Sequence, residues 1–158
     1  MTRELITSWH DHDLAVERAL SLAQENILIY AHELTPLKLD SEANHNVINR
    51  ILKTGETGCL QVILRNALNW HHTQPRLAKL CLSYSHLISI REAPSDLAHL
   101  TDSMVLIDKK HALIRFDEHF PRSKLLIDEA EEVRPYVMRF SQIFAASTES
   151  ASQTQLGL

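Results

Sequence analysis

The stretch from Asp102 to Phe116 constrains the fold most, because two apolar runs flank a short polar segment there. The first run, Met104–Ile107, ends at Asp108, and the second run is Ala112–Phe116. Two apolar runs separated by a few polar residues are typical of adjacent strands joined by a tight turn. The stretch therefore predicts an antiparallel hairpin late in the chain.

Alternating strand and helix patterns precede and follow the hairpin. Buried strands are predicted at three continuous apolar runs, Asn26–Tyr30, Cys59–Leu64 and Leu87–Arg91, and a short extra strand at Lys124–Ile127. Amphipathic patterns predict helices from Asp11 or Asp13 to Gln24, from Asp40 or Ser41 to Lys53, from Pro75 to Ser85 and from Asp128 onward. This order predicts an α/β three-layer sandwich, with a mixed, largely parallel sheet and the late antiparallel hairpin.

Composition limits the classes of function. The chain has 158 residues, which suits one domain, and a formal net charge of -4. This charge gives no electrostatic support for nucleic-acid binding, and no apolar run approaches the roughly 20 residues of a membrane span. We expect a cytoplasmic protein with one domain over residues 1–146, and a disordered Ser/Thr/Gln-rich tail from Ser147 to Leu158.

The hairpin resembles the strand-turn-strand that carries the catalytic motif of the phospholipase D superfamily. That motif is His, any residue, Lys, four residues and Asp, usually with a Gly-Ser pair farther on. If Asp108 is the motif Asp, Thr101 takes the histidine position, Ser103 takes the lysine position, and Arg115 and Phe116 take the Gly-Ser positions. None of the ten histidines is followed by a lysine two residues later. The resemblance therefore implies the fold of a half-domain of this superfamily without its histidine and lysine chemistry.

The resemblance covers roughly Ala23 to Ala146 in element order. In the superfamily one histidine attacks phosphorus, a second protonates the leaving group, and lysines bind phosphate oxygens. The wider pattern resembles uncharacterised bacterial domains of this type, some of which are fused to acetyltransferases, although no acetyltransferase signature is present here. Because single half-domains of the superfamily pair to complete a site, the resemblance also implies a homodimer.

Polar residues that follow the predicted strands define a candidate ligand site. In open α/β sheets, ligands bind beyond the carboxyl ends of the strands. The candidate positions are His32, Glu33, Arg65, His72, Thr101, Ser103, Asp108 and Arg115.

Each candidate also has an ordinary structural interpretation. His32 and Glu33 could form an acid/base pair or simply leave a buried strand. Arg65 and His72 could contact an anion or belong to a surface loop packed by Trp70. Arg115 could bind a carboxylate or phosphate, or pair with Asp102 or Asp117.

The segment Trp9–Asp13 places two imidazoles and two carboxylates within five residues. A metal site is one interpretation. The other is a helix N-terminus, where the helix dipole favours carboxylates. No downstream Cys or His stands at a standard ligand spacing, so we expect no metal and no other cofactor.

Three functions remain in view. The first is a catalytically inactive phospholipase D-like module for binding or assembly, with a small anionic ligand or a protein partner. The second is an enzyme of another class that uses His32, Glu33, His72 and Arg115 on a phosphate- or nucleotide-containing ligand. The third, which the acidic charge balance disfavours, is a nucleic-acid-binding module.

Overall fold

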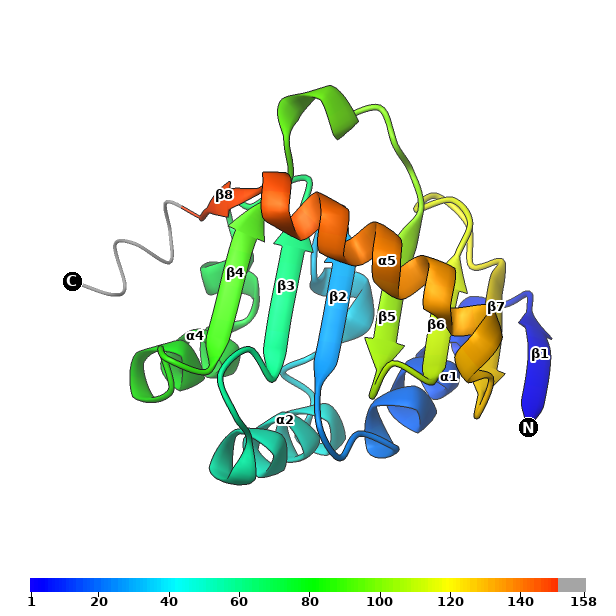
Figure 1. The fold of residues 1–158 in the computed structure, drawn as a ribbon, viewed down its shortest axis with the longest axis horizontal. Helices are drawn as coiled ribbons and strands as arrows, with labels where there is room; N and C mark the ends of the chain where they lie inside the picture. The colour runs from blue at the N-terminus through cyan, green and yellow to red at the C-terminus, as the bar shows by residue number, and fades with distance from the viewer. Residues whose placement is uncertain (151–158) are drawn as a thin grey trace.

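One eight-stranded sheet runs through the protein, and the computed structural model describes residues 1–150 of it (Figure 1). The strands are β1 Thr2–Ile6, β2 Ile27–Ala31, β3 Leu60–Leu64, β4 Ile88–Glu92, β5 Ser103–Ile107, β6 His111–Arg115, β7 Ser123–Ile127 and β8 Thr148–Glu149. The α-helices are α1 Trp9–Ser21, α2 Glu42–Thr54, α3 Trp70–Thr73, α4 Pro75–Ser83 and α5 Ala130–Ala146. Two short 3₁₀ helices, η1 Thr35–Leu37 and η2 Ser95–Leu97, complete the described elements.

The strand order is β1-β7-β6-β5-β2-β3-β4-β8. Strands β2, β3 and β4 are parallel to one another, which makes two parallel pairings, whereas the five other pairings in the sheet are antiparallel. The mixed sheet and the late hairpin are thus confirmed, but the expectation of a largely parallel sheet is wrong. The reason is the length of the connections: β5, β6 and β7 follow one another through short loops, which allow only antiparallel pairing.

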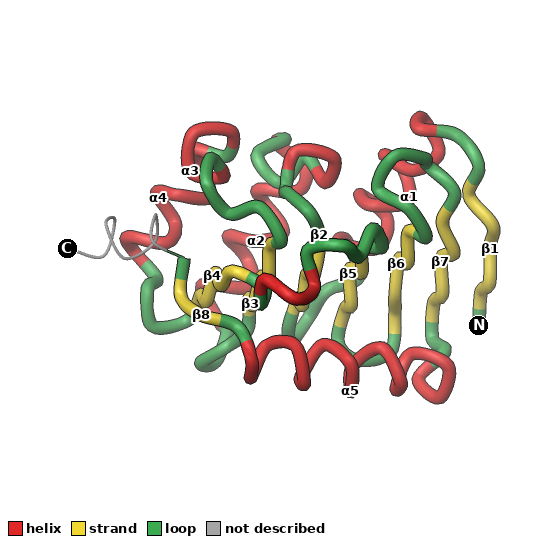
Figure 2. Tube along the Cα trace, turned by 90° about the horizontal axis from the view of Figure 1, so that it is seen from above, coloured by secondary structure: helices red, strands yellow, loops and turns green. Residues whose placement is uncertain are grey.

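Helices cover both faces of the sheet and make three layers (Figure 2). Helices α1 to α4 lie on one face, over the larger apolar core, and α5 crosses the other face alone, over a smaller core. Every residue of β2, β5 and β6 is buried, as expected for strands covered on both faces. None of the helices within residues 1–150 has the length and apolar character needed to cross a membrane.

The helix starts are confirmed in part. Ser41 caps α2 by accepting a hydrogen bond from the Asn44 amide, and Pro75 opens α4. Helix α1 starts earlier than expected, because Ser8, and neither Asp11 nor Asp13, is the cap and accepts from the Asp11 amide at 3.1 Å. Helix α5 likewise begins after Glu129 instead of being capped by Asp128.

The segment from Ser147 to Ser150 is ordered, which corrects the expectation that disorder begins at Ser147. Strand β8 pairs with β4 at the edge of the sheet, and the Ser150 amide donates to the Ile90 carbonyl at 3.1 Å. The Trp70 Nε1 donates to Ser150 Oγ at 3.3 Å. The open backbone groups of β4 thus attract this polar segment, which lacks an apolar pattern. The rest of the predicted tail, residues 151–158, lies outside the described residues.

Candidate functional site

Asp108 fastens the hairpin turn to the segment that enters β2. Asp108 and Lys109 have φ values of 53° and 58°, the signs that a type I′ hairpin turn requires. The Asp108 carboxylate accepts hydrogen bonds from the backbone amides of Gln24, Glu25 and Asn26 at 2.8–3.2 Å. Its role in this chain is therefore structural, at the opposite end of β5 from Thr101 and Ser103.

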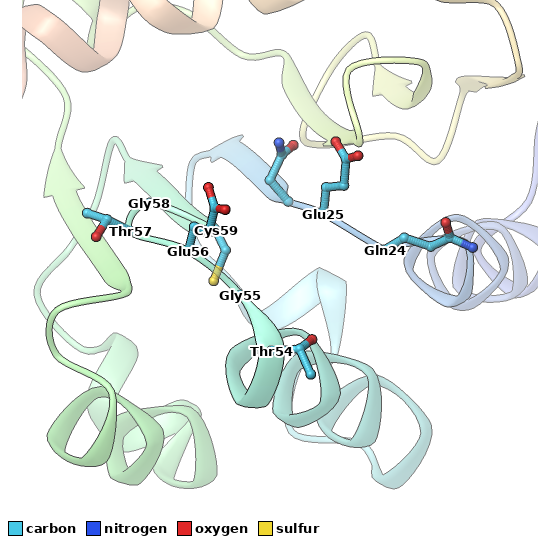
Figure 3. Close-up of a pocket in the computed structure, with 9 residues that line it drawn as sticks. Gln24, Glu25, Thr54, Gly55, Glu56, Thr57, Gly58 and Cys59 are labelled. Carbon is cyan, nitrogen blue, oxygen red and sulfur yellow. The ribbon is translucent and has the colours of Figure 1, made fainter.

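The segment that Asp108 binds forms part of a cavity. This cavity has a volume of about 410 Å³ and lies between residues 24–26 and 54–59. In Figure 3, Thr54 marks the end of α2, and Glu56 and Cys59 lie on the segment that leads into β3. Asp108 thus holds one wall of this polar cavity and takes no part in the surface that carries the other candidate residues.

Arg115 and Ser103 face one another across the hairpin at its open end. They are register partners, and the Arg115 Nε donates to Ser103 Oγ at 3.4 Å. The Arg115 Nη1 donates to the Glu118 carbonyl at 3.0 Å, and the residue is 3% exposed. Burial is the largest influence on the pKa of Arg115 and lowers it, whereas the nearby Glu118 carboxylate opposes that change. A buried cation therefore lies at the position where the resemblance to the superfamily motif would place the first residue of its Gly-Ser pair.

Glu118 contacts four of the candidate residues, and Arg115 is one of them. Its Oε2 accepts from Arg65 Nη2 at 3.1 Å and lies 3.5 Å from His32 Nδ1. Its backbone amide donates to the Thr101 carbonyl at 2.6 Å. The Arg65 side chain is 2% exposed and also donates to the Asp102 carbonyl at 2.7 Å. Arg65 is therefore committed to internal partners, which favours the structural interpretation of this residue.

Helix α5 supplies the partner of Asp102. Arg139 binds the Asp102 carboxylate with both Nη atoms, and this hydrogen bonding raises the pKa of Arg139. The guanidinium groups of Arg65 and Arg139 also lie 5.0 Å and 5.5 Å from the centroid of the Tyr30 ring. Of the two proposed pairings of Arg115, the one with Asp102 is thus wrong, because Arg139 takes that carboxylate.

A cavity of about 230 Å³ opens beside Arg115. The side chains that line it are His32, Glu33, Pro36, Arg115, Glu118 and His119. The guanidinium of Arg115, one of these residues, lies 5.4 Å from the centroid of the Trp9 ring. The cavity therefore combines one buried cation, two imidazoles and two carboxylates, and its cation packs against an aromatic ring.

The structure brings six of the eight candidate positions to this end of the sheet: His32, Glu33, Arg65, Thr101, Ser103 and Arg115. Asp108 lies at the other end. His72 is exposed on α3, with its ring centroid 4.1 Å from that of His71, and it does not line the cavity.

Sequence reasoning missed Glu118, His119 and Arg139. Glu118 and His119 stand in a polar loop whose pattern is that of any surface loop. The sequence could have identified Arg139, because it lies four residues before Ile143 and next to Phe140, two apolar residues that are buried in the structure. A basic residue at the border of a buried helical stripe often has an internal partner.

The two imidazoles and two carboxylates at the start of α1, His10 to Asp13, do not form a common site. His12 is 1% exposed within the larger core, whereas Asp13 is bonded to Lys38 Nζ at 2.6 Å on the surface. Within residues 1–150, no group of three or more His, Cys, Asp or Glu side chains is placed to hold a metal ion.

Solved structures share this fold, and a phospholipase D family member is among them. Nuc from Salmonella typhimurium, a phospholipase D family member, matches with a TM-score of 0.62 at 10% identity over 94% of this chain and 97% of its own. NucT from Helicobacter pylori matches with a TM-score of 0.62 at 12% identity over 94% and 98%. The archaeal chromatin protein TrmBL2, whose structure shows a mode of DNA binding, matches with a TM-score of 0.68 at 13% identity over 94% of this chain. This chain spans 54% of the length of TrmBL2.

Within this fold class, residues 9–156 match the model of a domain of unknown function, DUF7931. The chain belongs to that family. No curated protein sequence gives a significant match.

Proposed function

We propose that this chain is a phospholipase D-like domain that binds a small anionic ligand beside Arg115 and does not hydrolyse phosphodiesters. The observation that carries the proposal is the position of the Arg115 guanidinium. It is almost fully buried, lines the cavity, and uses only Nε and Nη1 for bonds within residues 1–150. Nη2 is left to face a ligand, and an arginine with a free N–H is suited to carboxylate or phosphate oxygens.

The lack of hydrolysis follows from the residues at the motif positions. Thr101 and Ser103 supply neither an imidazole to attack phosphorus nor an ammonium to bind phosphate oxygens. Ser103 is 5% exposed and its hydroxyl accepts from Arg115, so it supports the arginine. A motif with this content favours binding over catalysis.

The first test is a thermal-shift measurement with sodium phosphate, with sodium chloride at the same ionic strength as the reference. At about 100 times the dissociation constant we expect a shift of about 5 °C or more. Arg115→Gln should abolish it, whereas Arg122→Gln, which changes an exposed arginine outside the cavity, should retain it. If Arg115→Gln does not fold, His119→Ala, whose side chain is 69% exposed, should weaken the shift instead. Absence of any phosphate-specific shift would contradict the proposal.

The enzymatic alternative has one observation in its favour. His32 Nδ1 lies 3.5 Å from a Glu118 carboxylate oxygen in the same cavity, an arrangement that suits a general base. The assay is hydrolysis of bis(p-nitrophenyl) phosphate and of p-nitrophenyl phosphate. We expect no turnover above that of the His32→Gln variant. Turnover that His32→Gln abolishes would replace the binding proposal with catalysis.

The nucleic-acid alternative draws on the likeness to TrmBL2. An electrophoretic mobility shift with double-stranded DNA at low salt tests it, because phosphate-driven binding weakens steeply as salt rises. We expect no shift, given the net charge of -4. A salt-sensitive shift that Arg115→Gln does not alter would place DNA on another surface.

A further inference from the structure

We propose that the ligand of the Arg115 cavity is a nucleoside 5′-monophosphate, with its phosphate at Arg115 and its base at the mouth beside Trp9. This inference rests on the proposed function and adds the chemical class of the ligand. It draws on three features of the cavity: its carboxylate, its size and the aromatic ring next to it.

The phosphate end has a defined set of donors. Arg115, His32 and His119 line the cavity, and Arg115 Nη2 makes no hydrogen bond within the described residues. The other arginine of the cluster, Arg65, has both Nη atoms bound to Asp102 and Glu118. One guanidinium with two imidazoles can hold one terminal anionic group, and a phosphomonoester fits this number of donors.

The carboxylate of Glu33 affects which kind of anion the cavity can bind. Its side chain is exposed and lines the same cavity, and no ion pair within the described residues neutralises its carboxylate. Glu118, in contrast, is already paired with Arg65. A free carboxylate repels inorganic phosphate, whereas it accepts hydrogen bonds from hydroxyl groups. The cavity thus favours an anion that also carries hydroxyl donors, as the ribose of a nucleotide does.

The cavity is too small to enclose the base of a nucleotide as well as its ribose phosphate. A volume of about 230 Å³ is below the roughly 300 Å³ at which pockets begin to enclose whole drug-sized ligands. It can hold a ribose phosphate and leaves an attached base at the mouth. Trp9 is 44% exposed and touches Arg115, so its ring offers a stacking surface at that point.

The test is calorimetric titration of the full chain with inorganic phosphate, ribose 5-phosphate and the 5′-monophosphates of adenosine, guanosine, cytidine and uridine. We expect at least one nucleotide to bind about fivefold or more tightly than ribose 5-phosphate. Trp9→Ala should remove that difference, so that the variant binds the nucleotide no more tightly than ribose 5-phosphate. Trp9→Phe keeps an aromatic ring and should restore nucleotide binding.

Two further measurements sharpen the result. Glu33→Gln should weaken nucleotide binding and strengthen inorganic phosphate binding, an opposite response that a merely structural role would not give. Nucleotides should change the tryptophan fluorescence of the wild type but not of Trp9→Phe, because the remaining tryptophan, Trp70, is 3% exposed.

The outcomes separate the two proposals. If inorganic phosphate, ribose 5-phosphate and every nucleotide bind equally, the nucleotide inference is wrong and the anion-binding function stands. If none of these anions binds, both are wrong. Discrimination that survives in Trp9→Ala would also overturn the assignment of the base to Trp9.

Discussion

His12 is an imidazole held in an apolar setting on α1. It is 1% exposed, and burial is the largest cause that lowers its pKa from 6.5 to about 4. Arg115 lowers the pKa further, whereas Asp13 raises it and Lys38 lowers it. The Nδ1 atom has no hydrogen-bond partner within the described residues, so no hydrogen bond at this atom offsets the cost of burying a protonated ring.

This pKa gives stability a definite dependence on pH. Between pH 6.5 and 4 the unfolded chain binds a proton at His12 that the folded protein excludes, so the free energy of unfolding falls as pH falls. The contribution of His12 to that fall is about 3 kcal/mol. We expect His12→Gln to flatten the dependence, measured by urea unfolding from pH 4 to 7. His10→Gln, on an exposed position of the same helix, should behave as the wild type. Equal pH dependence in all three proteins would refute this account of His12.

The residues around Asp108 illustrate what a local sequence pattern can predict. The position of Asp108 after an apolar run predicts a turn, and the turn geometry follows from local backbone preferences. Its hydrogen-bond partners, Gln24 to Asn26, stand more than 80 positions earlier, so the hairpin sequence alone could not identify them. The same holds for Glu118, whose side chain meets Arg65 only because two loops end at one edge of the sheet.

At the scale of elements, α5 packs on the sheet through the smaller apolar core and also makes a charged contact with the segment before β5. Arg139 of α5 binds Asp102, directly before β5, and both side chains are partly exposed, at 35% and 24%. Exposed ion pairs contribute little to stability, but bidentate geometry and partial burial strengthen such a pair. We therefore expect this contact to add to the apolar packing that holds α5 on its face of the sheet.

A double-mutant cycle measures that contribution. Arg139→Gln, Asp102→Asn and the double variant should give a coupling energy of about 1 kcal/mol in urea unfolding. The pair of Arg18 and Glu4, whose side chains are 49% and 46% exposed, provides the control and should give a value near zero. Equal coupling in the two cycles would show that the Arg139 pair does not hold α5 in place.

At the scale of the whole molecule, the sheet has a protected centre and two weaker edges. Strand β2 lies between β3 and β5 and is buried throughout, whereas β1 has three exposed residues and one neighbouring strand. Strand β8 has two residues, both exposed, and also ends the sheet. Figure 1 shows these two strands at the opposite ends of the molecule.

Native-state hydrogen exchange should follow this arrangement. We expect the slowest exchange for the amides of β2, β3 and β5, which open only on global unfolding, and faster exchange for β1 and β8 through local opening. The measurement is amide exchange followed by NMR or mass spectrometry in the absence of denaturant. Protection of β1 as strong as that of β2 would mean that another surface covers this edge in solution.

The sequence by itself determined the elements whose signals are local. Continuous apolar runs gave β2 to β6, Ser41 and Pro75 marked helix starts, and the spacing around Asp108 identified the hairpin and its resemblance to a known fold. Tertiary structure alone decided the two edge strands, the internal partners of Asp102 and Arg65, and the cavity beside Arg115. The reason is that burial and turn preference act on neighbouring residues, whereas edge pairing and charge networks join residues that only the folded sheet brings together.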